Sequence, residues 1–183
     1  KREKKLPVIL SKEEVKKILK TPENIKHKAV LMLGYSAGLR ISEVINLKVN
    51  HIDSARMQIR VTGGKGHKDR YTILSKTTLE LLRAYYKVYK PKTWLFEGGF
   101  LKEQYSESSI RKILKDACKK TKTLKAVTYH TLRHCFATHL LEQGTNLQVI
   151  QHILGHSHLR TTNTYLHVQQ HCVDSVVSPI DCA

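Results

Sequence analysis

Six residues of this chain combine reactive side chains with distinctive local settings. Four lie in the last third: a His-x-x-Arg pair, a histidine that follows Leu-Gly, and a tyrosine nine residues beyond that histidine. An arginine in a Gly-Leu-Arg-x-x-Glu run and a lysine in a glycine turn lie upstream. A tyrosine can attack phosphorus, and cationic and hydrogen-bonding groups can stabilise the charge that builds on phosphate oxygens. The set therefore predicts covalent chemistry on a phosphodiester, and its members are Arg40, Lys65, His130, Arg133, His156 and Tyr165.

His130 and Arg133 are three residues apart at the predicted start of a helix, so both side chains are expected to project from one face. The first-turn amides and the helix dipole at that end favour an anion. The apolar Leu132 and Phe136 are expected to face the core, which leaves His130 and Arg133 on another side. A surface histidine and arginine explain most His-x-x-Arg occurrences, so this motif alone leaves both interpretations open.

Gly155 follows a predicted helix, where glycine adopts the left-handed conformation and sends His156 in a new direction. A plain helix cap with an incidental histidine is the alternative. An isolated tyrosine such as Tyr165 usually belongs to a core or an interface. The joint order of the His-x-x-Arg pair, Leu-Gly-His and a tyrosine in a Thr-rich segment favours a functional site.

Arg40 follows a predicted helix-ending glycine, and Glu43 lies three residues later. The carboxylate can brace the guanidinium while the arginine fork binds phosphate. A purely structural ion pair between Arg40 and Glu43 is the competing interpretation.

The charge balance indicates a polyanionic partner. The 183 residues include 32 Lys and Arg against 15 Asp and Glu, a formal net charge of +17. Such an excess favours nucleic acid first and an anionic membrane surface second. No apolar run approaches the ~18 residues of a membrane span and no signal peptide is visible, which weakens the membrane interpretation. Lys65 lies in a predicted hairpin turn beside Lys68 and Arg70, and these last two are expected to contact the DNA backbone.

Metal chemistry is the main rival interpretation. His130 with His134, and His152 with His156, have the i,i+4 spacing that can chelate zinc on a helix. No His-Glu-x-x-His motif occurs, and no cysteine or carboxylate stands at ligand spacing beside these pairs, so no native metal site is expected. The cysteines form no Cys-x-x-Cys pair and are interpreted as reduced thiols of a cytosolic protein; they are Cys118, Cys135, Cys172 and Cys182.

Capping signals and hydrophobic periods predict the elements that must position these residues. Ser11 and Glu14 form a capping box that opens a helix to about Lys20, and Thr21-Pro22 is expected to open the next helix, over residues 25–37. Residues 57–61 and 70–74 alternate like two half-buried strands joined by a glycine-rich turn. Further helices are expected over residues 41–47, 77–89, 108–120, 131–143, 147–154 and 158–166, with a third short strand at His51-Ile52. The predicted fold class is mainly α with a small antiparallel β-sheet (α+β).

Taken together, these motifs resemble the tyrosine recombinase (phage integrase) family, most closely its Xer-like bacterial branch and mobile-element integrases. The resemblance covers nearly the whole chain, from Leu6-Pro7 to Ser178-Pro179. It is carried by Gly38-Leu39-Arg40-Ile41-Ser42-Glu43, Gly64-Lys65-Gly66, His130-Thr131-Leu132-Arg133-His134-Cys135-Phe136-Ala137-Thr138-His139, Leu154-Gly155-His156 and Thr161-Thr162-x-x-Tyr165. It implies the tyrosine recombinase catalytic-domain fold.

The resemblance also implies a role for each residue. Tyr165 would be the nucleophile that forms a 3′-phosphotyrosyl bond and frees a 5′-hydroxyl. Arg40 and Arg133 would hold the non-bridging oxygens, and Glu43 would support them. Lys65 would protonate the leaving oxygen, His130 would assist proton transfer at the tyrosine, and His156 would hydrogen-bond the phosphate. The family needs neither metal nor nucleotide cofactor, and the sequence contains no P-loop.

Organisation and partners follow from the same resemblance. Residues 1–10 are expected to be the remnant of an interdomain linker, and residues 11–171 the catalytic domain. Residues 172–183 would form a tail that docks on a neighbouring protomer or packs on its own chain, and the N-terminal core-binding domain would be absent. The expected partners are double-stranded DNA target sites and like subunits in a tetramer, in the cytoplasm at the nucleoid. The role would be mobile-element integration and excision or dimer resolution. A DNA-binding module that no longer cuts and a type IB topoisomerase-like enzyme are the alternatives.

Overall fold

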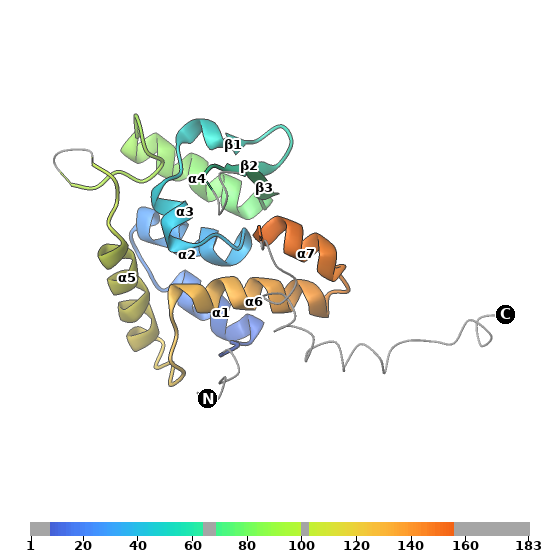
Figure 1. The fold of residues 1–183 in the computed structure, drawn as a ribbon. Coiled ribbons are helices and arrows are strands. Elements are labelled where there is room, and N and C mark those ends of the chain that lie inside the picture. The colour runs from blue at the N-terminus through green and yellow to red at the C-terminus, as the bar shows by residue number, and fades with distance from the viewer. Residues whose placement is uncertain (1–7, 64–68, 100–102, 156–183) are drawn as a thin grey trace, which may run out of the picture.

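The computed structural model describes residues 8–63, 69–99 and 103–155 of the chain (Figure 1). These ranges form a mainly helical domain with one small sheet, which confirms the predicted fold class. The helices are α1 (Lys12–Lys20), α2 (Ile25–Ser36), α3 (Ile41–Ile45), α4 (Lys76–Tyr89), α5 (Glu107–Lys120), α6 (Tyr129–Glu142) and α7 (Leu147–Leu154), with a 3₁₀ turn at Val49–His51. The strands are β1 (Ile52–Asp53), β2 (Gln58–Val61) and β3 (Arg70–Ile73).

Helix α6 packs beside α2, the helix that contacts most of the other described helices (Figure 1). The two helices approach closely at Gly34, where an added Cβ would lie 2.7 Å from the Tyr129 ring. The Tyr129 hydroxyl donates a hydrogen bond to the carbonyl oxygen of Val30 at 2.7 Å. Most of α6 is buried in consequence, so its polar side chains must find partners inside the protein.

The three strands form an antiparallel sheet in the order β1-β2-β3, which confirms the predicted strand pair. The predicted third strand is β1, and it begins one residue later than predicted, because His51 belongs to the 3₁₀ turn. Ile59 and Val61 of β2 face the core. On β3, however, Arg70 and Thr72 are the buried residues, while Tyr71 and Ile73 are exposed. The Thr72 hydroxyl donates to the carbonyl oxygen of Ala37 at 2.7 Å, which joins the sheet to the end of α2. The inner face of β3 is therefore polar and contacts the region where α2 ends.

One predicted helix cap is wrong. Ser11 does cap α1, and its capping box with Glu14 is formed. The second helix begins at Ile25, as predicted, but its cap is Asn24 rather than Thr21-Pro22, because the Asn24 side chain accepts hydrogen bonds from the amides of Lys26 and His27. Thr21 instead ends α1, and its hydroxyl donates to the carbonyl oxygen of Lys17.

The first described residues are bound to α6. Leu10 is fully buried, and its amide donates to the Cys135 sulfur at 3.2 Å. Its carbonyl oxygen accepts a hydrogen bond from His139 Nε2 at 3.0 Å. The predicted helix over residues 158–166 and the predicted tail over residues 172–183 lie outside the described part of the chain. None of the described helices is long and apolar enough to cross a membrane.

Candidate active site

Five elements meet where α2 ends. Gly38 turns the chain with a φ of +62°, and a Cβ added there would lie 2.5 Å from a Phe136 ring atom of α6 and 2.9 Å from Leu154 of α7. Glycine is therefore required both for the turn and for the close approach. The start of α3 and the inner face of β3 complete the region, which brings together Arg40, Glu43, Arg70 and Arg133.

Glu43 lies at the centre of an arginine cluster, which we define as Glu43 with Arg40, Arg70 and Arg133. Arg70 donates to both carboxylate oxygens, at 2.8 and 2.9 Å. Arg40 donates its Nη1 to Oε1 at 2.8 Å and its backbone amide to Oε2 at 2.7 Å. Arg133 Nη1 lies 3.6 Å from Oε2. Three guanidinium groups around one carboxylate leave two positive charges in excess, which favours an anionic ligand.

The Glu43 carboxylate stays ionised in this setting. Its side chain is 9% exposed, and such burial raises the pKa of a carboxyl group. The hydrogen bonds and charge of Arg70, the Arg40 amide and the charge of Arg133 outweigh burial, so the pKa of Glu43 lies below its ordinary value. The negative charge therefore persists and holds the arginines in place.

Arg133 is buried, which corrects the prediction that it lies away from the core with His130. Its side chain is 1% exposed, and its Nη1 and Nη2 atoms donate to the carbonyl oxygens of Gly38 at 2.6 Å and Leu154 at 2.5 Å. Leu154 is the last residue of α7 and Gly38 directly follows the C-cap of α2, so both carbonyls lie at helix C-termini, where the partial charge is negative. Arg133 can be buried because two helix ends and Glu43 share its charge.

His130 lies at the exposed rim of the cluster. Its ring contacts the His134 ring edge to face, with centroids 4.4 Å apart. Partial burial, with the charges of Arg133 and Arg40, lowers the pKa of His130 below its ordinary value. Burial and the charges of His130 and Arg133 lower the pKa of His134 to about 4. Both rings are therefore neutral at pH 7, the form in which a histidine can accept a proton.

Arg70 occupies a different position from the one expected of a DNA-backbone contact. Its side chain is 8% exposed, its Nε donates to the carbonyl oxygen of Ile153 at 2.9 Å, and both terminal nitrogens bind Glu43. In this structure Arg70 is thus part of the cluster. Arg40 is the most accessible of the three arginines, with a side chain 34% exposed.

The remaining predicted site residues lie outside the described part of the chain: Lys65, Lys68, His156 and Tyr165. Residues next to them are described. Gly155 ends α7 with a φ of +63°, which confirms the predicted left-handed glycine before His156. Arg70 follows the hairpin segment that contains Lys65. Two described residues beside or within the arginine cluster, Gly155 and Arg70, are therefore close in sequence to His156 and Lys65.

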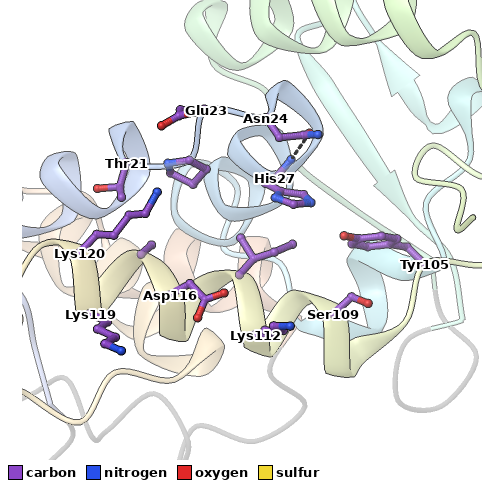
Figure 2. Close-up of a pocket in the computed structure, with 13 residues that line it drawn as sticks. Thr21, Glu23, Asn24, His27, Tyr105, Ser109, Lys112, Asp116, Lys119 and Lys120 are labelled. Atoms are coloured by element: carbon purple, nitrogen blue, oxygen red, sulfur yellow. Dashed lines mark hydrogen bonds between the residues drawn. The ribbon is translucent and has the colours of Figure 1, made fainter.

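A broad cavity lies elsewhere on the domain, between α5 and the connection from α1 to α2 (Figure 2). Its volume is about 840 Å³, and no predicted site residue lines it. Lysines and the acidic Glu23 and Asp116 share its walls, so its charge does not mark it as an anion site. Among the described residues, no group of three or more His, Cys, Asp or Glu side chains could hold a metal ion.

Comparison with known proteins identifies the fold and the family. The chain is 44% identical to the protein y4eF of Sinorhizobium fredii, named as an integrase or recombinase, over 185 residues that cover 99% of this chain and 72% of the relative. It is 40% identical to the tyrosine recombinase XerA of Pyrococcus horikoshii over 168 residues, which cover 90% of this chain and 58% of XerA. Residues 9–171 match the phage integrase family, and the chain belongs to that family.

Solved structures agree with this assignment. A crystal structure of XerA recombinase superposes with a TM-score of 0.80 at 33% identity, covering 90% of this chain and 60% of that one. A XerH site-specific recombinase bound to its difH substrate superposes with a TM-score of 0.78 at 25% identity, covering 94% of this chain and 53% of that one. The fold is therefore that of a tyrosine recombinase catalytic domain, and the enzyme class is the tyrosine-type site-specific recombinase.

Proposed function

We propose that this chain is the catalytic domain of a DNA recombinase or integrase that cuts and rejoins DNA through a covalent bond to Tyr165. The arginine cluster is the observation that carries the proposal. Its two excess positive charges lie where helix ends converge. Arg40 is its most accessible member, and the exposed His130 lies at its rim. Preorganised charge of this kind stabilises the negative charge that develops on a phosphoryl group in transfer.

The proposed reaction exchanges one phosphodiester for another. The Tyr165 oxygen attacks phosphorus, the bond to the 5′-oxygen breaks, and a 3′-phosphotyrosyl bond forms. Arg40 and Arg133 stabilise the non-bridging oxygens, and His156 donates a hydrogen bond to one of them. The neutral His130 accepts the phenolic proton, and Lys65 gives a proton to the leaving 5′-oxygen. A 5′-hydroxyl then attacks the phosphotyrosyl bond in the reverse sense, which releases Tyr165 and reseals the strand.

Because the phosphotyrosyl bond conserves the energy of the broken diester, the proposed cycle requires no nucleotide. The proposed partners are double-stranded DNA sites, with like subunits in a tetramer, in the cytoplasm at the nucleoid. XerH bound to a difH substrate supports the DNA partner. The chain spans 58% of XerA, so we propose residues 11–171 as a catalytic domain that works with further parts of a recombinase.

Covalent trapping tests this proposal. The protein, in the longest form that its gene encodes, is incubated with nicked duplexes taken from the DNA that flanks the gene, and a denaturing gel reports protein linked to DNA. We expect a shifted band that disappears with Tyr165→Phe. Tyr71→Phe is the matched control, since Tyr71 is an exposed tyrosine on β3 and its loss should leave the band unchanged.

Three outcomes separate the candidate functions. A band that persists in Tyr165→Phe would overturn the assignment of the nucleophile. Salt-sensitive DNA binding without any band would favour a DNA-binding module that no longer cuts. A band accompanied by relaxation of supercoiled DNA, without strand exchange between two sites, would favour a topoisomerase-like enzyme.

A further inference from the structure

All three guanidinium nitrogens of Arg70 donate hydrogen bonds within the protein. Its Nη1 and Nη2 atoms bind the two oxygens of Glu43 as a fork, and its Nε binds the carbonyl oxygen of Ile153. Glu43 belongs to α3, Ile153 to the last turn of α7, and Arg70 itself to β3. One guanidinium therefore connects three elements that are distant in sequence.

The surrounding structure is shaped to the Arg70 side chain. An added Cβ at Gly155 would lie 2.5 Å from Arg70 Cδ, so only glycine fits against this stem. On β3 the buried positions belong to Arg70 and Thr72, while the apolar Ile73 is 39% exposed. Placing an arginine inside and an isoleucine outside costs hydrophobic burial. The strand orientation therefore serves the polar contacts of its inner face.

The Arg70 fork fixes the orientation of the Glu43 carboxylate. Each Glu43 oxygen is shared: Oε1 accepts from Arg40 and Arg70, and Oε2 accepts from the Arg40 amide and Arg70. A bidentate arginine determines the plane of a carboxylate, which a lysine ammonium cannot do. The position of the more exposed Arg40 side chain thus depends on Arg70 through Glu43.

We infer that Arg70 is a positioning residue, which aligns Arg40 through Glu43 and binds the end of α7 that leads to His156. The inference rests on the proposed function for its effect on catalysis. It assigns Arg70 no contact with DNA, and it explains why the side chain is buried. A residue of this kind affects the rate of strand cleavage while DNA affinity stays the same.

Two substitutions and one control separate positioning from DNA contact. We expect both Arg70→Lys and Arg70→Gln to slow single-turnover cleavage by about 100-fold, the effect of a misplaced catalytic group. The salt dependence of DNA binding should be unchanged in both variants. The control is Arg60→Gln, because Arg60 lies on the neighbouring strand in an exposed pair with Asp69 and should leave cleavage unchanged. Thermal melting confirms that each variant is folded.

A direct phosphate contact gives the opposite pattern. Arg70→Lys would then retain most activity, and Arg70→Gln would reduce the slope of log K against log salt by about one. That result would overturn the inference. The double variant Arg70→Gln/Glu43→Gln adds a second check, since residues that act through one another are not additive. We expect it to cleave no more slowly than the slower single variant, and additive losses would count against the inference.

The pH dependence of the cleavage rate separates lost positioning from lost packing, because lost packing alone would not change it. Glu43 faces the charged Arg40, Arg70 and Arg133 and the phenol of Tyr129. Burial raises the pKa of Glu43, and Arg70 supplies the chief opposing contact. In Arg70→Gln the carboxylate should therefore protonate at a higher pH. The ratio of variant to wild-type cleavage rate should fall as pH decreases from about 8 to about 5, and a constant ratio would contradict the inference.

Hydrogen exchange tests the geometry without any enzymatic reaction. The Arg40 amide binds Glu43 Oε2 at 2.7 Å, whereas the neighbouring Val44 amide binds a helix carbonyl. In Arg70→Lys we expect exchange at Arg40 to rise about 10-fold, the weight of a hydrogen bond to a charged group, with Val44 unchanged. Unchanged exchange at Arg40 would overturn the positioning role. Faster exchange in a protein that never cleaves DNA would uphold it and reject the proposed function instead.

Discussion

Two arginines of the same hairpin form carboxylate pairs in opposite settings. Arg60 of β2 binds Asp69 at 2.7 Å, with side chains 52% and 37% exposed. Arg70 of β3 binds Glu43 at 2.8 Å, with side chains 8% and 9% exposed. The bond lengths are nearly equal, so length does not distinguish the two pairs. Solvent screens the outer pair and makes it weak, whereas each charge of the inner pair depends on its partner.

Left-handed glycines show the same contrast. Gly38 and Gly144 both have positive φ, at +62° and +82°. A Cβ at Gly38 would collide with Phe136 and Leu154, while nothing lies within 4 Å of the same position at Gly144. At the arginine cluster, therefore, the buried charges depend on one another, and the packing around Gly38 leaves no space for an added methyl group. Changes there should have large effects, and the same changes on the outer surface should have small ones.

Removal of the Glu43 carboxylate should produce the largest loss in the free energy of unfolding. Glu43→Ala leaves Arg70 and Arg133 buried without their shared countercharge, and we expect a loss of about 3–5 kcal/mol in the free energy of unfolding. Urea denaturation at pH 7 measures it. The matched change at the outer pair, Asp69→Asn, should leave the denaturation midpoint unchanged within error. Equal losses in both variants would mean that burial does not separate the two pairs.

A methyl group added at Gly38 should produce the next largest loss in the free energy of unfolding. Gly38→Ala forces a side chain into left-handed backbone and against the Phe136 ring, and we expect a loss of about 2–4 kcal/mol. Gly144→Ala carries the backbone strain alone and should lose about 1–2 kcal/mol. Urea denaturation of the two variants in parallel gives the steric contribution by difference. Equal losses would show that the packing around Gly38 adjusts to the methyl group.

Capping and periodicity predicted most of the fold, because these signals are local. The capping box at Ser11, the strand pair and the glycine after α7 all appear where expected. The cap of α2 was assigned to Thr21-Pro22 because this pair is also compatible with a helix start, and only the amides that the Asn24 side chain actually binds identify the cap. Local signals therefore establish that an element exists more firmly than which residue caps it.

Burial of charge at the site could not be predicted from the sequence. The motif spacing indicated Arg40, Glu43 and Arg133, but an exposed arginine was expected at position 70. Alternation along β3 indicates that Tyr71 and Ile73 face inward, and the structure reverses this. The reversal depends on acceptors from distant segments, Glu43 and the carbonyl oxygens of Ala37 and Ile153. Tertiary partners outweighed hydrophobic pattern at this strand.

The histidines beside the arginine cluster make the stability of the folded protein depend on pH. His134 has a pKa of about 4 in the folded protein, lowered from an ordinary 6.5 by burial and by the charges of His130 and Arg133. As pH falls below 6.5, the unfolded chain gains a proton that the folded protein does not bind. Stability contributed by His134 is therefore present above pH 6.5 and is lost progressively as pH falls towards 4.

We expect the wild-type protein to lose about 1–2 kcal/mol through His134 between pH 7 and pH 5, since one pKa unit corresponds to about 1.4 kcal/mol and partial solvent access reduces the effect. Urea denaturation at several pH values in this range measures the slope. His134→Asn should give a shallower dependence of the unfolding free energy on pH. The remaining dependence comes from other histidines whose pKa values are also lowered: His130, His139, His51 and His27. Because the pKa of Glu43 lies below its ordinary value, its titration falls below this window. An unchanged pH dependence in His134→Asn would mean that His134 takes up its proton in the folded state as readily as in the unfolded chain. The pair of neutral rings, His130 and His134, would then not be maintained in solution.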